Sequence, residues 1–355
     1  MNSDRKPSVS IVVPAYNEAA ILEKNLAILC DYMKGLEDQC DWELIIVNDG
    51  STDETGDIAE SFAKTRKNVT VLHHMFNFRL GQALRYAFSN CRGDIVVVMD
   101  SDLSYAPDHI GKMLAKMKES RAKIVIASPY AKGGKVSNVP WLRKVMSVWA
   151  NRFIAFFARD RYLDRLTTIT GMVRAYDRVF LSRLNLKAMD MDVNPEIIYK
   201  GMILRARIVE IPAHLDWGVE KGHKAGGKTR KSSMRIFRSI LASLISGFVF
   251  RPFMFFILPG FVLLLLSLYP IAWVFIHTIR FYLTLPSSGA SLDYRFSEAV
   301  AAAFDLSPHS FIVGGIGLMI AIQLISLGTL ALQNKKYFEE MFHLGSSIYR
   351  VTRND

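Results

Sequence analysis

Several classes of protein are excluded by what this 355-residue sequence lacks. It has three cysteines, Cys30, Cys40 and Cys91, an odd number whose spacing matches no zinc-binding pattern. A disulfide-stapled scaffold is therefore not expected, and the cysteines fit a reduced, cytosolic domain. The amino-terminal residues form no apolar run, so we expect no cleaved signal peptide. No G-x-G-x-x-G pattern follows the first expected strand, which argues against a dinucleotide-binding oxidoreductase.

Acidic residues are fewer than basic residues. The sequence has 44 Lys and Arg residues against 33 Asp and Glu residues, which gives a formal net charge of +11 at pH 7. The basic residues are not interleaved with aromatic side chains as in a nucleic-acid recognition module, so we expect no nucleic-acid partner. Hydrophobic residues make up 50% of the chain, a high share for a soluble enzyme. We therefore expect the positive charge to serve contact with a membrane.

Two long segments in the last third of the chain carry no charged residue, namely residues 253–276 and 311–332. About 20 apolar residues span a bilayer as a helix. We expect two transmembrane helices, at about 253–279 and 311–332, joined by an outward loop within a membrane region of residues 251–334. A buried core hairpin is the alternative, although buried helices of this length are seldom apolar on every side.

Proline and glycine mark both segments. Pro259 and Pro270 should kink the first helix. Four glycines give the second helix a small-residue face for close packing, either within one chain or in an oligomer: Gly314, Gly315, Gly317 and Gly328.

The flanking charges predict the orientation. Residues 219–252 contain eight basic residues against one acid, Glu220, and Lys335 and Lys336 follow the second segment. Positive flanks stay in the cytoplasm, so a first domain at 1–233 and a tail at 335–355 should both be cytoplasmic. Residues 234–250 have apolar residues at helical spacing and arginine on the other face. This pattern predicts an amphipathic helix in the headgroup plane, with a connecting helix packed on the domain as the alternative.

The most informative motif lies at 93–102, where a buried strand ends in two acids. Ile95–Met99 is an unbroken apolar run after Gly93, typical of a strand in a parallel sheet. Asp100 and Asp102 are two residues apart, so they share a face at the carboxyl end of the strand, where open α/β sheets bind ligands. Two carboxylates suit Mg²⁺ or Mn²⁺ carrying a diphosphate. The alternative is a pair of solvated acids that cap the next helix.

Two further segments have the same construction. Residues 9–18 read as a strand stopped by Pro14, followed by Tyr16, Asn17 and Glu18 before an apolar-periodic helix. Residues 42–53 read as a strand that ends in an Asn-Asp-Gly turn. Each could be ordinary strand-to-helix punctuation. Three strands that all end in polar, acid-bearing loops form one rim, which favours a ligand site.

Together these motifs resemble family 2 inverting glycosyltransferases of the GT-A fold, over roughly residues 7–235. Within that family they look most like polyprenyl-phosphate sugar synthases of the dolichyl-phosphate mannose synthase type. The markers are V-S-I-V-V-P-A-Y-N-E, I-I-V-N-D-G-S-T-D, L-G-Q-A from Leu80, D-S-D-L-S from Asp100 and T-G-M-V-R-A-Y from Thr170. The resemblance implies an α/β, Rossmann-like mixed sheet that binds a nucleotide sugar.

The resemblance also implies a function. The chain should be an integral membrane enzyme of a prokaryotic plasma membrane or the endoplasmic reticulum. It should move one sugar from a UDP- or GDP-linked donor to a dolichyl or undecaprenyl phosphate, with inversion and with Mg²⁺ or Mn²⁺ held by Asp100 and Asp102. The implied donor-binding residues are Pro14, Ala15, Tyr16, Glu18, Val47, Asp49, Gly81, Asp100, Ser101 and Asp102.

A polyprenyl phosphate acceptor changes what the catalytic residues must do. A phosphate monoester has its second pKa near 6, so the acceptor is ionised at pH 7 and needs no general base. It needs a cationic clamp that offsets repulsion between two phosphate groups. The candidates for this clamp are Arg143, Arg174, Arg230 and Lys231, and the expected catalytic residues are Asp100, Asp102, Arg143 and Arg174.

Two other functions stay open. Transfer to a lipid or glycan hydroxyl would need a base, for which Asp164, Asp190 or Asp192 could serve. A non-catalytic membrane adaptor derived from such an enzyme is the second alternative, against which the intact acid rim argues.

The sequence also departs from the family pattern. Asn48 stands where the family often has a first acid, and Ser128-Pro-Tyr130 replaces a Ser-Arg-Tyr stretch. The Gln-x-x-Arg-Trp motif of processive synthases is absent, which argues against chain polymerisation. These departures leave the sugar and the base open. Between the motifs, strands are expected at Ala122–Ser128 and Ile203–Ile211 and a helix from Asn194, with another helix over Trp141–Phe157.

Overall fold

The computed structural model describes residues 6–138, 166–216, 253–285 and 291–352. It divides into two units, the first formed by Met1–Gly247 with Phe342–Asp355 and the second by Phe248–Met341.

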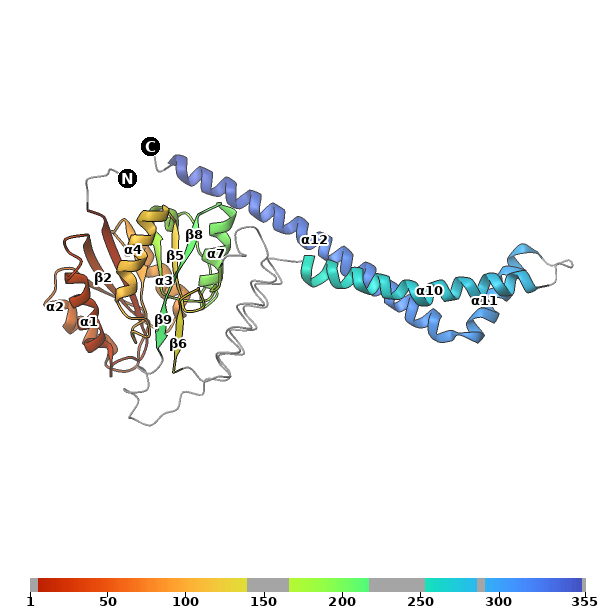
Figure 1. Cartoon of the computed structure of the whole chain (residues 1–355), viewed down its shortest axis with the longest axis horizontal. Helices are drawn as coiled ribbons and strands as arrows, with labels where there is room; N and C mark the ends of the chain where they lie inside the picture. The colour runs from red at the N-terminus through yellow and green to blue at the C-terminus, as the bar shows by residue number, and fades with distance from the viewer. Residues whose placement is uncertain (1–5, 139–165, 217–252, 286–290, 353–355) are drawn as a thin grey trace. The chain divides into compact units, whose positions relative to one another are not determined.

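The first unit is built on a seven-stranded sheet in the order β3-β2-β1-β4-β7-β5-β8. Its paired strands are parallel except for β7, which runs antiparallel to both β4 and β5 (Figure 1). The strands are β1 Ser8–Ala15, β2 Asp41–Asn48, β3 Val69–His73, β4 Ile95–Val98, β5 Ile124–Ser128, β7 Arg174–Asp177 and β8 Ile208–Pro212. A small parallel pair, β6 Lys135–Ser137 and β9 His214–Asp216, lies beside it. The expected mixed α/β sheet is confirmed.

Helices cover both faces of this sheet, which explains the apolar runs within β1, β2, β4 and β5. One face packs on α1 Leu22–Lys34, α2 Thr55–Lys64 and α4 Asp108–Ser120. The other packs on α3 Arg79–Asn90, α6 Arg178–Ser182 and α7 Val193–Ile203. In β1 the side chains alternate between the two cores, with Ile11 and Val13 in the first and Val12 in the second.

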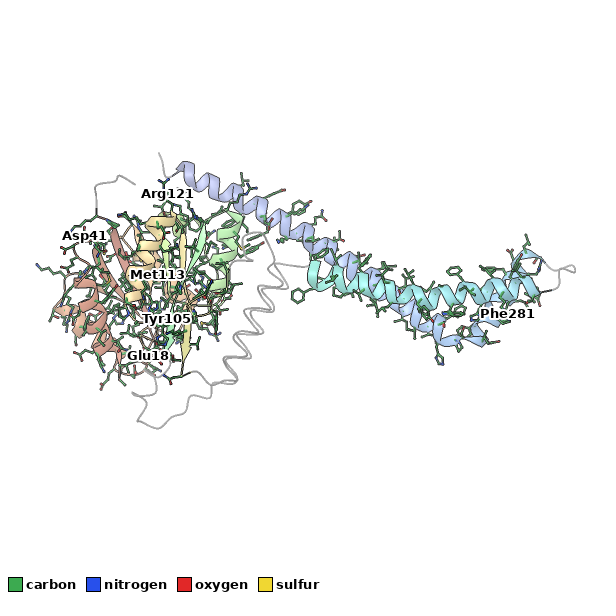
Figure 2. All side chains as sticks on the ribbon, in the orientation of Figure 1. Glu18, Asp41, Tyr105, Met113, Arg121 and Phe281 are labelled. Atoms are coloured by element: carbon green, nitrogen blue, oxygen red, sulfur yellow. The ribbon has the colours of Figure 1, made fainter. Side chains whose placement is uncertain are left out.

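The carboxyl ends of the parallel strands lie at one edge of the sheet. Figure 2 shows Glu18 and Tyr105 at this edge, and Asp41 and Arg121 at the opposite edge. The pairing of β1 with β2 sets Pro14 opposite Val47 and Ala15 opposite Asn48, so both strands end at the same level. The three acid-bearing loops recognised in the sequence therefore do form one rim.

The second unit is helical. It contains η1 Phe253–Ile257, α10 Leu258–Thr284, α11 Leu292–Leu306 and α12 Pro308–Thr352 as far as Met341. Two of its helical stretches, Phe255–Thr284 and Pro308–Phe342, are long and apolar enough to cross a membrane. Only 11% and 17% of the residues in their most apolar windows are buried. A buried core hairpin would enclose most of these side chains, so that alternative does not fit.

Glycine allows α10 and α12 to approach closely. A Cβ at Gly317 would lie 3.1 Å from Cβ of Ser267 on α10, and one at Gly328 would meet Ile257 of η1, directly before α10. A Cβ at Gly314 would also contact α10, whereas one at Gly315 would meet nothing within 4 Å. The small-residue face is thus used inside one chain.

Some boundaries differ from the sequence interpretation. The segment expected to be a loop contains α11, which Ser291 caps by accepting a hydrogen bond from the backbone N–H of Tyr294. The second long helix continues to Thr352, so most of the expected tail is helical. Pro259 lies in the first turn of α10 and Pro270 inside it. The expected helices at 234–250 and Trp141–Phe157 lie outside the described residues.

Candidate functional site: the acid-bearing rim of the sheet

Asp100 and Asp102 lie shortly after β4, with Met99 between the strand and Asp100, and Ser104 hydrogen-bonds to both carboxylates. The Ser104 hydroxyl donates to Oδ2 of Asp100 at 3.4 Å, and its backbone N–H donates to Oδ1 of Asp102 at 2.9 Å. Leu103, between Asp102 and Ser104, has a φ of 51°, so the chain turns sharply after the strand. Burial, followed by the negative charge of Asp102, raises the pKa of Asp100 to about 7.

Because of this electrostatic environment, the two aspartates fit a hard divalent cation. Like-charged carboxylates in a partly buried site repel each other, and a cation between them would remove the repulsion. Carboxylate oxygens are the ligands that Mg²⁺ and Mn²⁺ prefer. Among the described residues no group of three or more His, Cys, Asp and Glu side chains could hold a metal by itself. The oxygens of a bound diphosphate would have to complete the coordination.

A buried amide fixes the residue between the two aspartates. Nδ2 of Asn25, on α1, donates to the backbone carbonyl of Ser101 at 2.9 Å. Asn25 is 4% exposed, and its hydrogen bond to Ser101 is partly shielded from water. The first helix thereby holds the acid-bearing turn in place.

Hydrogen bonds connect the loop after β1 to the loop after β2. The backbone N–H of Asn17 donates to Oγ of Ser51 at 3.1 Å, and its side-chain oxygen accepts from the N–H of Thr52 at 2.8 Å. The backbone N–H of Glu18 donates to Oγ1 of Thr55 at 2.9 Å. Asn17 has a φ of 56°, a conformation that Asn tolerates better than most residues. These contacts fix the position of the loop after β1, which carries Tyr16 and Glu18.

Asp49, at the end of β2, is buried and already partly hydrogen-bonded. Its Oδ1 accepts from Nδ1 of His74 at 2.7 Å and from the backbone N–H of Phe78 at 3.0 Å. Its own backbone N–H donates to the carbonyl of Ala15 at 3.0 Å, which ties β2 to the end of β1. Nδ2 of Asn48, the residue before it, donates to Nδ1 of His73 at 3.1 Å.

Gly81 and the segment around Asp190 pack closely. A Cβ at Gly81 would lie 2.6 Å from the carbonyl oxygen of Ala188, so a larger residue would push the two apart. Arg79 forms an ion pair with Asp190 at 2.9 Å, and Asp192 accepts from the backbone N–H of Asp190 at 3.0 Å. Asp190 and Asp192, the acids named for a hydroxyl acceptor, are thus engaged with neighbouring groups.

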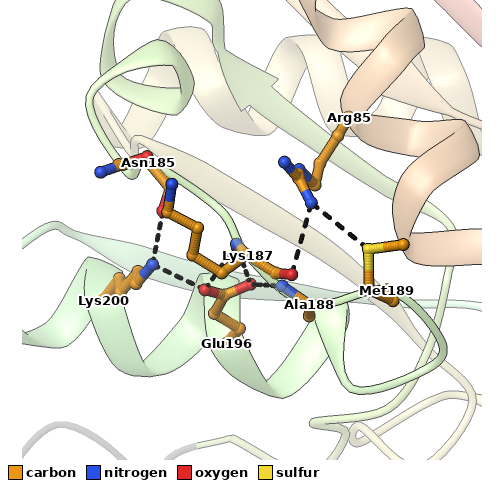
Figure 3. A network of polar contacts seen from close by, with 7 residues as sticks. All are labelled: Arg85, Asn185, Lys187, Ala188, Met189, Glu196 and Lys200. Carbon is orange, nitrogen blue, oxygen red and sulfur yellow. Dashed lines mark hydrogen bonds and ion pairs between the residues drawn. The ribbon is translucent and has the colours of Figure 1, made fainter.

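A polar network supports this segment (Figure 3). Glu196 accepts from the backbone N–H groups of Lys187 and Ala188, at 2.9 Å in each case, and from Nζ of Lys200 at 2.6 Å. Arg85, on α3, donates to the carbonyl of Lys187 at 3.3 Å. Residues 187–190 are consequently held between α3 and α7.

Arg174 occupies a different place from the one expected. It is 0% exposed, and its guanidinium donates to the backbone carbonyls of Gly171 (2.7 Å), Asn194 (3.1 Å) and Ile169. A guanidinium enclosed in this way offers nothing to an acceptor phosphate. In this structure Arg174 braces β7 against the segment before it and against α7. This corrects the expectation that it belongs to the phosphate clamp.

The residues that replace the Ser-Arg-Tyr stretch form another internal network. Oγ of Ser128 lies 2.6 Å from Oγ1 of Thr167 and 2.7 Å from Oγ1 of Thr168. Glu210 accepts from the backbone N–H groups of both threonines. Burial raises the pKa of Glu210, although these hydrogen bonds oppose the effect. Ser128 and Glu210 thus hold residues 167–168 against the sheet.

The remaining expected residues are not all described. Arg143, Arg230, Lys231 and Asp164 lie outside the described residues, so three of the four clamp candidates have no placement here. Pro14, Ala15, Val47, Ser101 and the aspartates gather at the rim. Sequence reasoning missed Asn25, His74 and Ser104. Two of them left a signal, because Ser104 closes the D-S-D-L-S marker and His74 is a polar residue directly after a strand of the same parallel set.

Comparison with known proteins agrees with this geometry. Residues 10–184 match the family model described as glycosyl transferase family 2. The chain is 30% identical over 246 residues to an undecaprenyl-phosphate mannosyltransferase of Micrococcus luteus, covering 67% of this chain and 96% of that protein. The chain belongs to glycosyltransferase family 2.

Two further likenesses are more distant. A dolichol-phosphate mannosyltransferase of Pyrococcus furiosus is 29% identical over 221 residues, which cover 62% of this chain but only 60% of that relative's length. A crystal structure of a mycobacterial protein matches with a TM-score of 0.50 and 18% identity, over 68% of this chain and 74% of that one. The structural likeness supports the fold alone.

Proposed function

We propose that this protein transfers one sugar from a nucleotide-diphosphate sugar to a polyprenyl phosphate, with inversion. The observation that carries the proposal is the rim itself. It brings Asp100 and Asp102 together with Asp49 and the Tyr16–Glu18 loop at the carboxyl ends of three adjacent strands. Similarity to a dolichol-phosphate mannosyltransferase and to an undecaprenyl-phosphate mannosyltransferase supports a polyprenyl phosphate as the acceptor.

Asp100 and Asp102 would hold Mg²⁺ or Mn²⁺, with the diphosphate of the donor providing further oxygen ligands. When bound, the cation supplies positive charge that stabilises the leaving diphosphate. Asn25 and Ser104 keep the two carboxylates in position, so that little reorganisation is needed as charge develops. Asp49 would contact the base, and Tyr16 and Glu18 would line the nucleoside.

The acceptor phosphate provides its own nucleophile, because it is ionised at neutral pH. The protein's task is then to position this anion and to balance its charge. Arg143, Arg230 and Lys231 remain the candidates for that role, and Arg174 does not. No carboxylate base is required, which agrees with the engagement of Asp190 and Asp192 in local contacts.

A membrane anchor fits this chemistry, because a polyprenyl chain cannot leave the bilayer. The two long apolar helices would provide the anchor, and the basic residues between 219 and 252 would place the catalytic unit on the cytoplasmic side. The sugar would then be transferred at the cytoplasmic leaflet.

The test uses the purified full chain in detergent with radiolabelled UDP- and GDP-sugars, Mg²⁺ or Mn²⁺, and either a polyprenyl phosphate or the matching polyprenol. We expect a lipid-linked sugar with the phosphate and none with the alcohol. Asp102→Asn should abolish product, whereas Asp31→Asn, at a 73% exposed side chain on α1, should not. Product with the alcohol alone, or no product with any donor, would overturn the proposal.

A further inference from the structure

Asp49 is held by a short loop that closes around one of its two carboxylate oxygens. The loop runs from His74 to Phe78, between β3 and α3, and both of its end residues donate to Oδ1. Two donors use the two lone pairs of that oxygen. Among the described residues Oδ2 of Asp49 has no hydrogen-bond partner. The carboxylate therefore has one occupied and one open oxygen.

The loop is fastened closely enough to fix this arrangement. Gly50 has a φ of +64°, and a Cβ there would lie 2.2 Å from the carbonyl carbon of Phe76 and 2.6 Å from the backbone nitrogen of Asn77. Only glycine allows the loop to approach β2 so closely. The backbone N–H of His74 also donates to the carbonyl of Asn48 at 2.9 Å.

The ring of His74 is fixed as well. It stacks on Tyr86 of α3, with ring centroids 5.2 Å apart and an interplanar angle of 19°. The ring of Phe78 meets it edge-on at 5.1 Å and 80°. The side chain of His74 is 9% exposed and that of Asp49 is 6% exposed. An imidazole held in this way presents Nδ1 to the carboxylate in one orientation.

We infer that His74 acts as a positioning residue that makes the site select uridine over guanosine in the nucleotide donor. The inference rests on the proposed function, in which Asp49 contacts the base. Guanine presents two adjacent donors, N1–H and the N2 amino group, which match both oxygens of a free carboxylate. Uracil presents a single donor, N3–H. With Oδ1 occupied by His74 and Phe78, Asp49 has one oxygen to offer, and uracil is the base that needs only one.

The first experiment measures the affinities of UDP and GDP by calorimetry, with the full chain in detergent and excess Mg²⁺. We expect UDP to bind at least about tenfold more tightly than GDP, as the loss of one buried hydrogen bond to a charged group implies. Equal or tighter binding of GDP would overturn the inference and leave the proposed function intact. Failure of both nucleotides to bind would overturn the proposed function and the inference together.

Two substitutions test the role of His74 itself. In His74→Asn the amide nitrogen is bonded to Cγ, as Nδ1 is in histidine. An N–H can therefore still reach Oδ1 of Asp49, and the preference for UDP should persist. In His74→Gln the amide lies one bond further out, Oδ1 is released, and the ratio of the GDP to the UDP dissociation constant should fall about tenfold. His73→Gln is the matched control. The ring of His73 contacts Glu60 and Asn48 and not Asp49, so this variant should keep the wild-type ratio of the two dissociation constants.

The ratio of the GDP to the UDP dissociation constant distinguishes a loss of Asp49 positioning from a loss of folded protein. A variant that is simply less folded loses binding stoichiometry for both nucleotides equally, and the ratio of the two constants stays as in the wild type. An unchanged ratio in His74→Gln would therefore show that His74 does not set the base preference.

Discussion

The side-chain amide of Asn25 donates a hydrogen bond to the backbone carbonyl of Ser101, with 2.9 Å between the two atoms. Through this contact a helix of the core reaches the turn that carries both acids of the site. The contact shows that the orientation of Asp100 and Asp102 depends on packing beneath the rim as well as on the motif itself.

Replacement of Asn25 by Leu should therefore weaken both stability and cation binding. The partly buried carbonyl of Ser101 would lose its partner, at a cost of about 1 kcal/mol in the free energy of unfolding. The Mg²⁺ concentration needed for half-maximal donor binding should rise. Chemical denaturation and a Mg²⁺ titration give the two quantities. Asn90→Leu, at an exposed position at the far end of α3, is the control. Wild-type Mg²⁺ dependence in Asn25→Leu would contradict this account.

Asp100 should make the metal-free protein less stable as the pH rises. Its folded-state pKa of about 7 lies above the ordinary value of 3.8, so the unfolded chain loses this proton first. The stabilisation is complete below pH 3.8 and is lost as the pH rises through 7.

The variant Asp100→Asn removes this effect. In EDTA its melting temperature should exceed that of the wild type by several degrees at pH 8, and the gap should shrink toward pH 4.5. Thermal unfolding at a series of pH values gives the gap. Addition of Mg²⁺ and UDP should stabilise the wild type alone. A gap that does not change with pH would show that Asp100 is an ordinary, solvated acid.

Gly50→Ala should disturb the donor site more than the fold. A left-handed φ and contact with the backbone of Phe76 and Asn77 both oppose a Cβ at this position. We expect a loss of about 1–3 kcal/mol in stability and a marked rise in the KM for the donor. Gly345→Ala is the control, because a Cβ there meets nothing within 4 Å and α12 favours alanine. Unchanged donor KM in Gly50→Ala would argue against the close packing of the loop on β2.

Arg174→Lys distinguishes an internal brace from a phosphate clamp. A lysine cannot donate to the carbonyls of Gly171, Asn194 and Ile169 in the same geometry. We expect a loss of about 3–5 kcal/mol in stability, with the KM for the polyprenyl phosphate unchanged in the fraction that stays folded. Denaturation and steady-state kinetics measure the two effects. A stable variant with a raised acceptor KM would return Arg174 to the clamp.

The strands of the rim could be predicted from sequence because each carries its own local signal. β1, β2 and β4 contain apolar runs and end at Ala15, Asn48 and Val98, next to the polar motifs, and β5 ends at Ser128 as expected. The strand expected at Ile203–Ile211 was shifted, since Ile203 ends α7 and the strand begins at Ile208. An apolar residue at a helix end looks like the start of a strand when only periodicity is considered.

The environment of individual charges could not be predicted in the same way. Arg174 looks like any arginine after a Gly-containing loop, and its burial follows from carbonyls contributed by residues up to 20 positions away. The contact between His74 and Asp49 joins residues 25 apart in the sequence and depends on how closely a loop approaches a neighbouring strand. Such contacts belong to the tertiary structure, and residue spacing carries no trace of them.

The most direct test is a crystal of the protein with UDP and Mn²⁺, measured for anomalous scattering by manganese. The account predicts one manganese peak at the carboxyl end of β4, within coordinating distance of Asp102 and of the diphosphate oxygens. A nucleotide bound without metal at this edge, or a manganese ion that neither Asp100 nor Asp102 reaches, would contradict it.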